Sequence, residues 1–225
     1  MKIIETALEQ GRHMLSEYES KKVLASYQIP VTKEIEVDSV EELTQATQDI
    51  GYPLVLKGCA SEIAHKTEKG LIEVDIRNND EALIAFHKIK AGMNATQTTV
   101  LVQEMIRGQR ELVIGLTRDA QFGPCVMFGL GGIFTEILKD ISFRVAPLEK
   151  RDALEMMQEI KGHKILGAVR GMEAADLDQL CDILIQVGQI GLDHEVIKEV
   201  DINPVILTRG KPVAVDALIV LESNR

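Results

Sequence analysis

The alternation of helix and strand signals in the first third of the chain constrains its fold most strongly. A helix pattern begins at Ser39 and ends at Gly51, because glycine readily adopts the backbone conformation that closes a helix. The apolar run Leu54–Leu56 follows at once and is typical of a buried strand, and Leu71–Ile76 alternates as a second strand. A helix is then expected over Asn78–Ile89, because asparagine and aspartate at its start favour a helix N-terminus. Helices that alternate with strands predict a small α/β lobe.

The pattern changes after Thr99, where strand signals follow one another with few helix signals between them. Successive strands predict a mainly antiparallel second lobe. The fold class is therefore α/β (α+β), with an N-terminal helical extension at 1–14 and lobes at 15–104 and 105–225, between which a ligand cleft is expected. The expected strands are Val100–Gln103, Glu111–Leu116, Pro124–Phe128, Phe134–Leu138, Val196–Ile202, Val205–Leu207 and Val213–Leu218, and the expected helices are Ala153–Ile160 and Ala174–Ile190.

Charge and composition exclude several classes of protein. The net charge is −10, with 25 Lys and Arg dispersed among 35 acidic residues, and there is no Trp, so nucleic-acid binding is disfavoured. No run approaches the roughly 20 apolar residues that span a bilayer, and Met1–His13 lacks the apolar core of a signal peptide. We expect a cytoplasmic protein with no membrane or nucleic-acid partner.

The three cysteines, Cys59, Cys125 and Cys181, are widely separated and show no metal-ligand spacing. They are typical of reduced thiols in the cytosol. Cys59 follows a proposed site, but a small residue at the end of a buried strand explains it more simply than a reactive thiol does.

Lys57 and His65 are the strongest chemical signals. Lys57 ends the apolar strand and His65 lies in the polar loop that follows. A lysine held on a buried strand is a fixed positive charge suited to phosphate oxygens, and a loop histidine can accept and release a proton or a phosphoryl group near neutral pH. Together they indicate nucleotide-dependent phosphoryl chemistry.

The segment from Gln103 to Glu111 links two expected strands through a short turn. Its main-chain groups could meet an adenine edge, and the Glu111 carboxylate could accept two hydrogen bonds from a ribose diol. A plain hairpin with solvated charges is the alternative, and this segment alone favours it.

The cluster Gly129-Leu130-Gly131-Gly132 follows an apolar strand. Glycine lets the backbone approach phosphate oxygens closely, although a tight turn is the commoner use of such a cluster, which matches neither the Walker nor the dinucleotide-binding fingerprint. Downstream, Glu136, Asp140 and Arg144 suit either a moving phosphate or a solvated strand face.

Hard oxygen ligands occur at two places near the end of the chain. Strand alternation puts Asp201 and Asn203 on one face, and pairing with the strand that carries Asp216 would bring these residues together. Such ligands suit Mg²⁺, which keeps several waters and binds substrate phosphates. Turn chemistry before Pro204 is the alternative reading.

In combination these motifs are specific. From about Leu15 to Leu221 the chain resembles the ATP-grasp β subunits of ADP-forming acyl-CoA synthetases. The resemblance is carried by Ser16-Glu17-Tyr18-Glu19-Ser20-Lys21, Lys57, His65-Lys66-Thr67, Gln103-Glu104, Glu111, Gly129-Leu130-Gly131-Gly132, Asp201-Ile202-Asn203-Pro204 and Asp216.

The resemblance implies an ATP-grasp fold, with the nucleotide cleft between the lobes, and the reaction acyl-CoA + phosphate + ADP = acid + CoA + ATP. An acyl phosphate and phosphohistidines on two subunits are implied as intermediates. His65 is then the phosphohistidine of this subunit, and Asp201 orients or stabilises it. The implied ATP/ADP ligands are Lys57 for the phosphates, Gln103, Glu104, Met105 and Ile106 for adenine, Glu111 for ribose, and Gly131 and Gly132, while Asn203 and Asp216 hold Mg²⁺.

The resemblance also implies a partner, a CoA-binding α subunit that carries the other phosphohistidine, in an α₂β₂ assembly. A succinyl-CoA synthetase β subunit is the nearest alternative, but it normally carries a further C-terminal domain and this chain stops at Arg225. A carboxylate–amine ligase and a nucleotide-sensing subunit without turnover are further alternatives. One departure from the family is Leu71, which stands where a second glycine is common.

Overall fold

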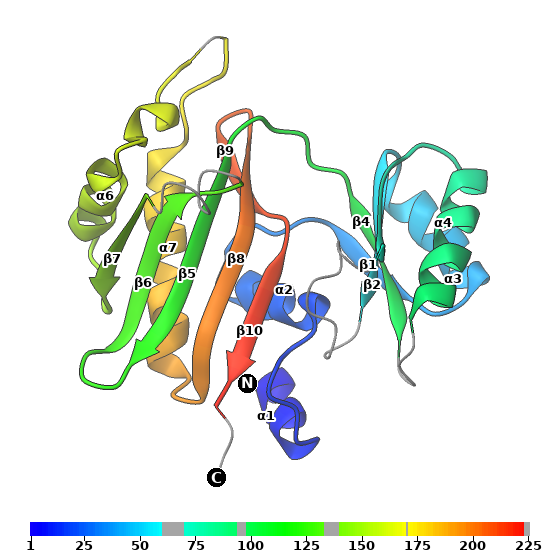
Figure 1. The fold of residues 1–225 in the computed structure, drawn as a ribbon, viewed down its shortest axis with the longest axis horizontal. Helices are drawn as coiled ribbons and strands as arrows, with labels where there is room; N and C mark the ends of the chain where they lie inside the picture. Colours follow the sequence, from blue (N-terminus) through cyan, green and yellow to red (C-terminus); the bar gives the residue numbers. More distant parts are fainter. Residues whose placement is uncertain (60–69, 94–97, 133–139, 170, 223–225) are drawn as a thin grey trace. The chain divides into compact units, whose positions relative to one another are not determined.

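The computed structural model describes residues 1–59, 70–93, 98–132, 140–169 and 171–222. It contains two compact units that are interleaved along the chain, whose elements can be followed in Figure 1. The large unit comprises Met1–Leu15, Glu19–Val31 and Arg107–Arg225, and the small unit comprises Ser16–Tyr18 and Thr32–Ile106. The linear ranges 1–14, 15–104 and 105–225 stay a prediction, because these units describe packing rather than boundaries along the sequence.

The small unit is a four-stranded antiparallel sheet in the order β1-β4-β2-β3, with two helices packed on it. The helix starts follow the sequence signals, since the side chains of Ser39 and Asn78 accept hydrogen bonds from the N–H groups of Glu42 and Glu81. Gly51 ends the first helix with a φ of +83°. The elements are β1 (Glu34–Val37), α3 (Val40–Ile50), β2 (Leu54–Cys59), β3 (Ile72–Ile76), α4 (Asn79–Gly92) and β4 (Thr99–Glu104).

The large unit contains a six-stranded sheet whose described pairs are all antiparallel, as predicted for the second half of the chain. The order is β10-β8-β5-β6-β7, and β9 also pairs with β8. The strands are β5 (Glu111–Asp119), β6 (Gly123–Leu130), β7 (Ile141–Val145), β8 (Ile197–Thr208), β9 (Lys211–Ala214) and β10 (Ala217–Leu221).

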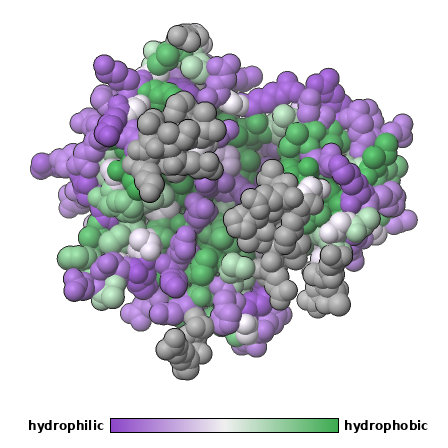
Figure 2. Space-filling view, in the orientation of Figure 1, coloured by the Kyte–Doolittle hydropathy of each residue, from purple (hydrophilic) through white to green (hydrophobic). Residues whose placement is uncertain are grey.

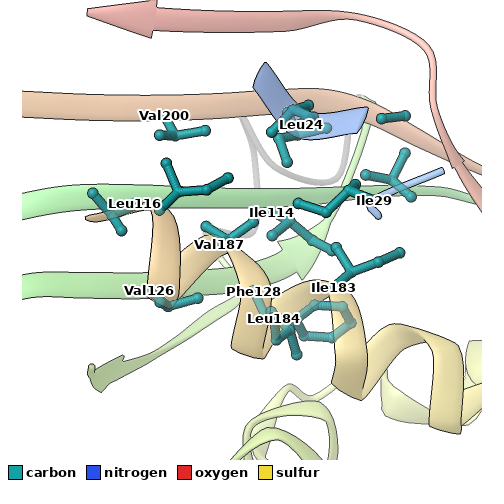
Figure 3. Packing of buried hydrophobic residues seen from close by; sticks show 14 of the residues in the cluster. Leu24, Ile29, Ile114, Leu116, Val126, Phe128, Ile183, Leu184, Val187 and Val200 are labelled. Atoms are coloured by element: carbon teal, nitrogen blue, oxygen red, sulfur yellow. The ribbon is translucent and has the colours of Figure 1, made fainter. Parts of the chain in front are cut away.

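Helix α7 contributes many of the apolar side chains that pack against the sheet of the large unit. Its apolar residues recur at helical spacing, so that Ile183, Leu184 and Val187 pack against Phe128 and other residues of the sheet (Figure 3). The helices that the structure describes in this part of the chain are α1 (Lys2–Glu9), α2 (Glu17–Ser26), α6 (Lys150–Glu159), the short 3₁₀ helix η1 (His163–Leu166) and α7 (Leu177–Asp193). The core is aliphatic, with Phe128 as its one large aromatic among the buried residues described for this unit.

Two predictions about where strands end are wrong. Strand β8 runs without interruption, because Asn203 and Pro204 together oppose the single residue Val113 of β5 and form a β-bulge. The expected strand Val213–Leu218 is instead two strands, β9 and β10, separated at Val215 and Asp216. The expected strand Phe134–Leu138 lies outside the described residues.

Strand β7 is an element that the sequence reading missed. Its residues alternate between apolar and polar types, and Phe143 and Val145 are exposed, so its apolar side chains do not enter the helical core. No helix among the described residues is long and apolar enough to cross a membrane. Hydrophilic residues are spread over the visible face of the molecule (Figure 2).

Replacement of Phe128 tests the packing of the large core. Phe128 is 0% exposed, whereas Phe122, in the turn before β6, is 65% exposed. We expect Phe128→Ala to lower the free energy of unfolding by about 3–5 kcal/mol, because it leaves a cavity between the sheet and α7. Phe122→Ala, the matched control, should change it by less than about 0.5 kcal/mol. Urea unfolding of both variants checks this, and equal effects would contradict the packing described.

Candidate functional site

Lys57 lies inside β2 rather than at its end, because Gly58 and Cys59 continue the pairing with β4. Every residue of this strand is buried. The Lys57 Nζ donates a hydrogen bond of 2.7 Å to Oε1 of Glu17, the first residue of α2, and the two side chains are only 6% and 1% exposed. The lysine charge is thus held in a buried ion pair.

The sequence reading missed Glu17. In sequence, Ser16-Glu17-Tyr18-Glu19 has the spacing of a capping box, in which Ser16 and Glu19 satisfy amides at a helix start and Glu17 has no role of its own. In the structure Glu19 accepts hydrogen bonds of 2.7 and 2.8 Å from Arg12. Only the burial of Glu17 against β2, a tertiary contact, distinguishes it from its neighbour.

The four residues Gln103 to Ile106 close β4 and continue beyond it in the small unit. The Glu104 N–H donates to the Lys33 carbonyl at 2.9 Å, and the Met105 N–H donates to the Pro53 carbonyl at 3.1 Å. These two N–H groups are therefore engaged within the unit. An adenine edge here would meet carbonyl oxygens of the segment or the N–H of Ile106.

Glu111, Gly131 and Gly132 meet in the large unit. They line a cavity of about 290 Å³ together with Gln109, Arg110, Leu130 and Ile165. The Gly131 N–H donates to the Glu111 carbonyl at 2.7 Å, and a Cβ on Gly131 would lie 2.9 Å from the Glu111 backbone. At Gly132 the φ is +64° and a Cβ would lie 3.0 Å from Oε2 of Glu111. Gly131 is required for this close approach to the Glu111 backbone, whereas glycine at position 132 is favoured by the positive φ.

Arg110 supports this cavity and was not singled out in the sequence. It is 3% exposed, and its guanidinium donates to the carbonyls of Ile165 and Gly167 at 3.0 and 3.2 Å and to that of Glu173. A planar guanidinium with several donors can hold a loop in this way. Arg110 therefore fixes the segment after η1 beside the start of β5.

Asn203 and Asp216 come together as the sequence predicts. The Asn203 N–H donates to the Asp216 carbonyl at 3.2 Å, and the Val215 N–H donates to the Pro204 carbonyl at 3.0 Å. The β-bulge in β8 and the break between β9 and β10 therefore lie side by side. Asn203 is exposed and Asp216 is half-buried, so their side chains have access to solvent.

Asp201 pairs with Gly115 of β5 and Leu218 of β10 in the sheet register. We call Asp201, Asn203 and Asp216 the acidic region. Burial, with smaller contributions from the charges of Glu199 and Asp216, raises the pKa of Asp201 to about 6. A divalent cation would relieve this negative field. Among the described residues no group of three or more His, Cys, Asp or Glu could hold a metal. Asn203 and Asp216 offer oxygen atoms of the kind that Mg²⁺ accepts beside water and phosphate.

Two residues considered for a moving phosphate have structural partners. The Asp140 carboxylate accepts hydrogen bonds of 2.7 Å from the N–H groups of both Lys161 and Gly162. Arg144 of β7 donates to both carboxylate oxygens of Glu159, at 2.9 and 2.5 Å. His65 and Glu136 lie outside the described residues.

The ATP-grasp domain family model matches residues 6–221. The chain is 42% identical over 224 residues to the acetate–CoA ligase [ADP-forming] I subunit beta of Pyrococcus furiosus, an alignment that covers 97% of this chain and 96% of the relative. It is 38% identical over 224 residues to the acetate–CoA ligase [ADP-forming] I of Archaeoglobus fulgidus, covering 97% of this chain and 32% of that protein.

A solved structure of the dinucleotide-forming acetyl-coenzyme A synthetase 1 of Ca. Korarchaeum cryptofilum superposes with a TM-score of 0.87 at 42% identity, covering 98% of this chain and 99% of that one. That structure holds coenzyme A and Mg-AMPPCP, with its phosphohistidine segment pointing towards the nucleotide-binding site. The two-unit architecture described above is therefore shared with a nucleotide-bound relative.

Replacement of Asp201 tests the electrostatics of the acidic region. Because its pKa is raised from 3.8 to about 6, the unfolded chain loses this proton first as the pH rises, and stability falls between about pH 4 and pH 6. We expect Asp201→Asn to raise the free energy of unfolding at pH 7 by on the order of 2 kcal/mol and to change it little near pH 4. Urea unfolding in EDTA at both pH values measures this, and a variant less stable than wild type at pH 7 would contradict it.

Proposed function

The chain belongs to the ATP-grasp family, and from this premise we propose that it is the nucleotide-binding β subunit of an ADP-forming acyl-CoA synthetase of the acetate–CoA ligase type. The reaction is acyl-CoA + phosphate + ADP = acid + CoA + ATP. The observation that carries the proposal is 42% identity to the Pyrococcus furiosus β subunit over nearly the whole of both chains.

In this proposal the nucleotide is bound by the residues that the sequence indicates for its phosphates, adenine and ribose. The buried Lys57 neutralises charge on the phosphates, because a cation in a site of low dielectric acts more strongly than one in water. Gln103, Glu104, Met105 and Ile106 bind adenine. Glu111 accepts hydrogen bonds from the ribose, which the cavity beside it supports, and the backbone at Gly131 and Gly132 lines the same cavity.

Asn203 and Asp216 hold the magnesium ion that accompanies the nucleotide. Their proximity and their solvent access support this role. When bound, Mg²⁺ neutralises charge on the nucleotide phosphates. The Korarchaeum relative binds its nucleotide analogue with Mg²⁺.

His65 carries the phosphoryl group. In the direction of ATP synthesis, a terminal oxygen of the ADP β-phosphate attacks the phosphorus on the imidazole. A P–O bond forms, the P–N bond breaks, and its electron pair returns to the ring nitrogen. Asp201 is proposed to orient the imidazole and to stabilise it when it is charged. The acidic field around Asp201 supports such a role.

The partner is proposed to be a CoA-binding α subunit with its own phosphohistidine, in an α₂β₂ assembly. The relative from Archaeoglobus fulgidus supports a division of this kind, because this chain corresponds to only 32% of its length. The rest of that longer protein has room for the CoA and acyl sites, which we assign here to a separate subunit.

Labelling of the chain with γ-labelled ATP and Mg²⁺ tests the phosphohistidine. We expect acid-labile label on the wild-type protein and its loss in His65→Asn, because phosphoramidates hydrolyse in acid and asparagine cannot form one. His87→Asn, a change in the helix α4, is the control and should label normally. If ATP binds but no label appears with the partner present, a nucleotide-sensing subunit becomes the better proposal.

The magnesium ligands are tested by Asp216→Asn. Replacing a charged oxygen ligand by an amide should raise the Mg²⁺ concentration for half-maximal labelling by about tenfold or more. Asp182→Asn, an exposed position on α7, should leave it unchanged. A Mg²⁺ titration of the labelling rate measures both variants, and an unaltered Asp216→Asn would remove this residue from the metal site.

A further inference from the structure

The ion pair between Lys57 and Glu17 is unusually costly to bury. The Nζ–Oε1 distance is 2.7 Å, and the two side chains are 6% and 1% exposed. Removing two charges from water takes free energy that their mutual attraction scarcely returns, and well-packed apolar residues in their place are often as stable or more so. Stability of the fold therefore does not explain why the chain keeps both charges.

The apolar surroundings of the Lys57–Glu17 pair add to the cost of burying it. The residues opposite Lys57 on the neighbouring strands are Leu101 and Ile72, which are both apolar. Two residues after Glu17 in the same helix, Glu19 pairs with Arg12 at a similar distance, but those side chains are 27% and 23% exposed. Solvent screens the second pair and not the first, so Glu17 exerts the stronger electrostatic hold on its partner.

Glu17 also stands where a carboxylate is favoured. It is the first residue of α2, a helix of 10 residues, and the N-terminus of a helix attracts negative charge. The helix N-terminus thereby stabilises the charged form of Glu17, whereas lysine has a flexible four-carbon stem. An ammonium carries three N–H donors, so contact with Glu17 does not exhaust its capacity to bind phosphate oxygens.

We propose that Glu17 is a positioning residue for Lys57, holding its ammonium on the nucleotide phosphates while the phosphoryl group is transferred between the nucleotide and His65. This inference rests on the proposed function and adds to it a residue that does not itself touch the nucleotide. Electrostatic groups stabilise a transition state best when their geometry is fixed before the reaction. Glu17 contributes to that fixation through the buried 2.7 Å contact with the Lys57 ammonium.

A positioning role predicts a split between affinity and rate. Glu17→Gln keeps the size of the side chain and removes its charge. The phosphates can still attract Lys57, and with one negative charge fewer nearby the ground-state complex is not weakened. The transfer slows because the ammonium is less well placed when the phosphoryl group moves. A merely structural role would instead alter stability without this split.

The experiment uses the complete enzyme, reconstituted with its partner subunit, and follows the rate at which label from γ-labelled Mg-ATP reaches protein. We expect Glu17→Gln to slow transfer at least about tenfold, with a Kd for Mg-ATP within about threefold of wild type or tighter. Glu19→Gln is the matched control and should behave as wild type. In a Lys57→Met background Glu17→Gln should add less than about a twofold effect, because it acts through the lysine.

Each outcome is decisive. If the wild-type enzyme is labelled and Glu17→Gln is labelled at the same rate, the inference is overturned and the proposed function stays intact. Additive effects of Glu17→Gln and Lys57→Met also overturn it, because Glu17 would then act by another route. Absence of label on the wild-type enzyme overturns the proposed function, and the inference with it. If Glu17→Gln does not fold, Glu17→Asp replaces it. Its shorter side chain should slow transfer at least about threefold while the Kd for Mg-ATP stays unchanged. A wild-type transfer rate in Glu17→Asp would overturn the inference.

Discussion

The antiparallel pairing of β8 with its neighbours gives the strand one buried apolar face and one polar face. Val200 and Ile202 are buried in the core of the large unit, whereas Asp201 and Asn203 alternate with them on the other face. The bulge at Asn203 and Pro204 lets the strand continue while it turns the Asn203 N–H towards the Asp216 carbonyl. The acidic region thus depends on the hydrophobic packing behind it, which fixes the register of the sheet.

Charge burial has a different character in each unit. In the small unit the charges of Lys57 and Glu17 compensate each other at 2.7 Å. In the large unit Asp201 lies near two further carboxylates, and its pKa is raised to about 6. The first arrangement fixes a buried cation beside its counter-charge, and the second is a concentration of negative charge that a bound cation would relieve. Both fit a nucleotide that is bound as its magnesium complex.

Much of the fold could be predicted because its signals are local. The caps at Ser39 and Asn78 are formed as the sequence indicates, and the apolar stripe of α7 faces the sheet. The strand breaks were placed less well, because Asn203-Pro204 looks like a turn in sequence and becomes a bulge only when β5 pairs across it. Strand β7 was missed although its apolar and polar residues alternate, and its burial is the reverse of what that alternation indicates, since Ser142 is buried while Phe143 and Val145 are exposed.

The sequence by itself determined the family, which its motifs specify in combination, and the antiparallel second half, which follows from the two-residue period of successive strands. It also indicated that Asn203 and Asp216 meet, but the bulge and the strand break that bring them together were not predicted. Only the tertiary structure decided that Lys57 is paired with Glu17 and that Gly131 and Gly132 pack against Glu111. These contacts join residues far apart in the chain. Their partners are selected by sheet register and burial, which no local pattern encodes.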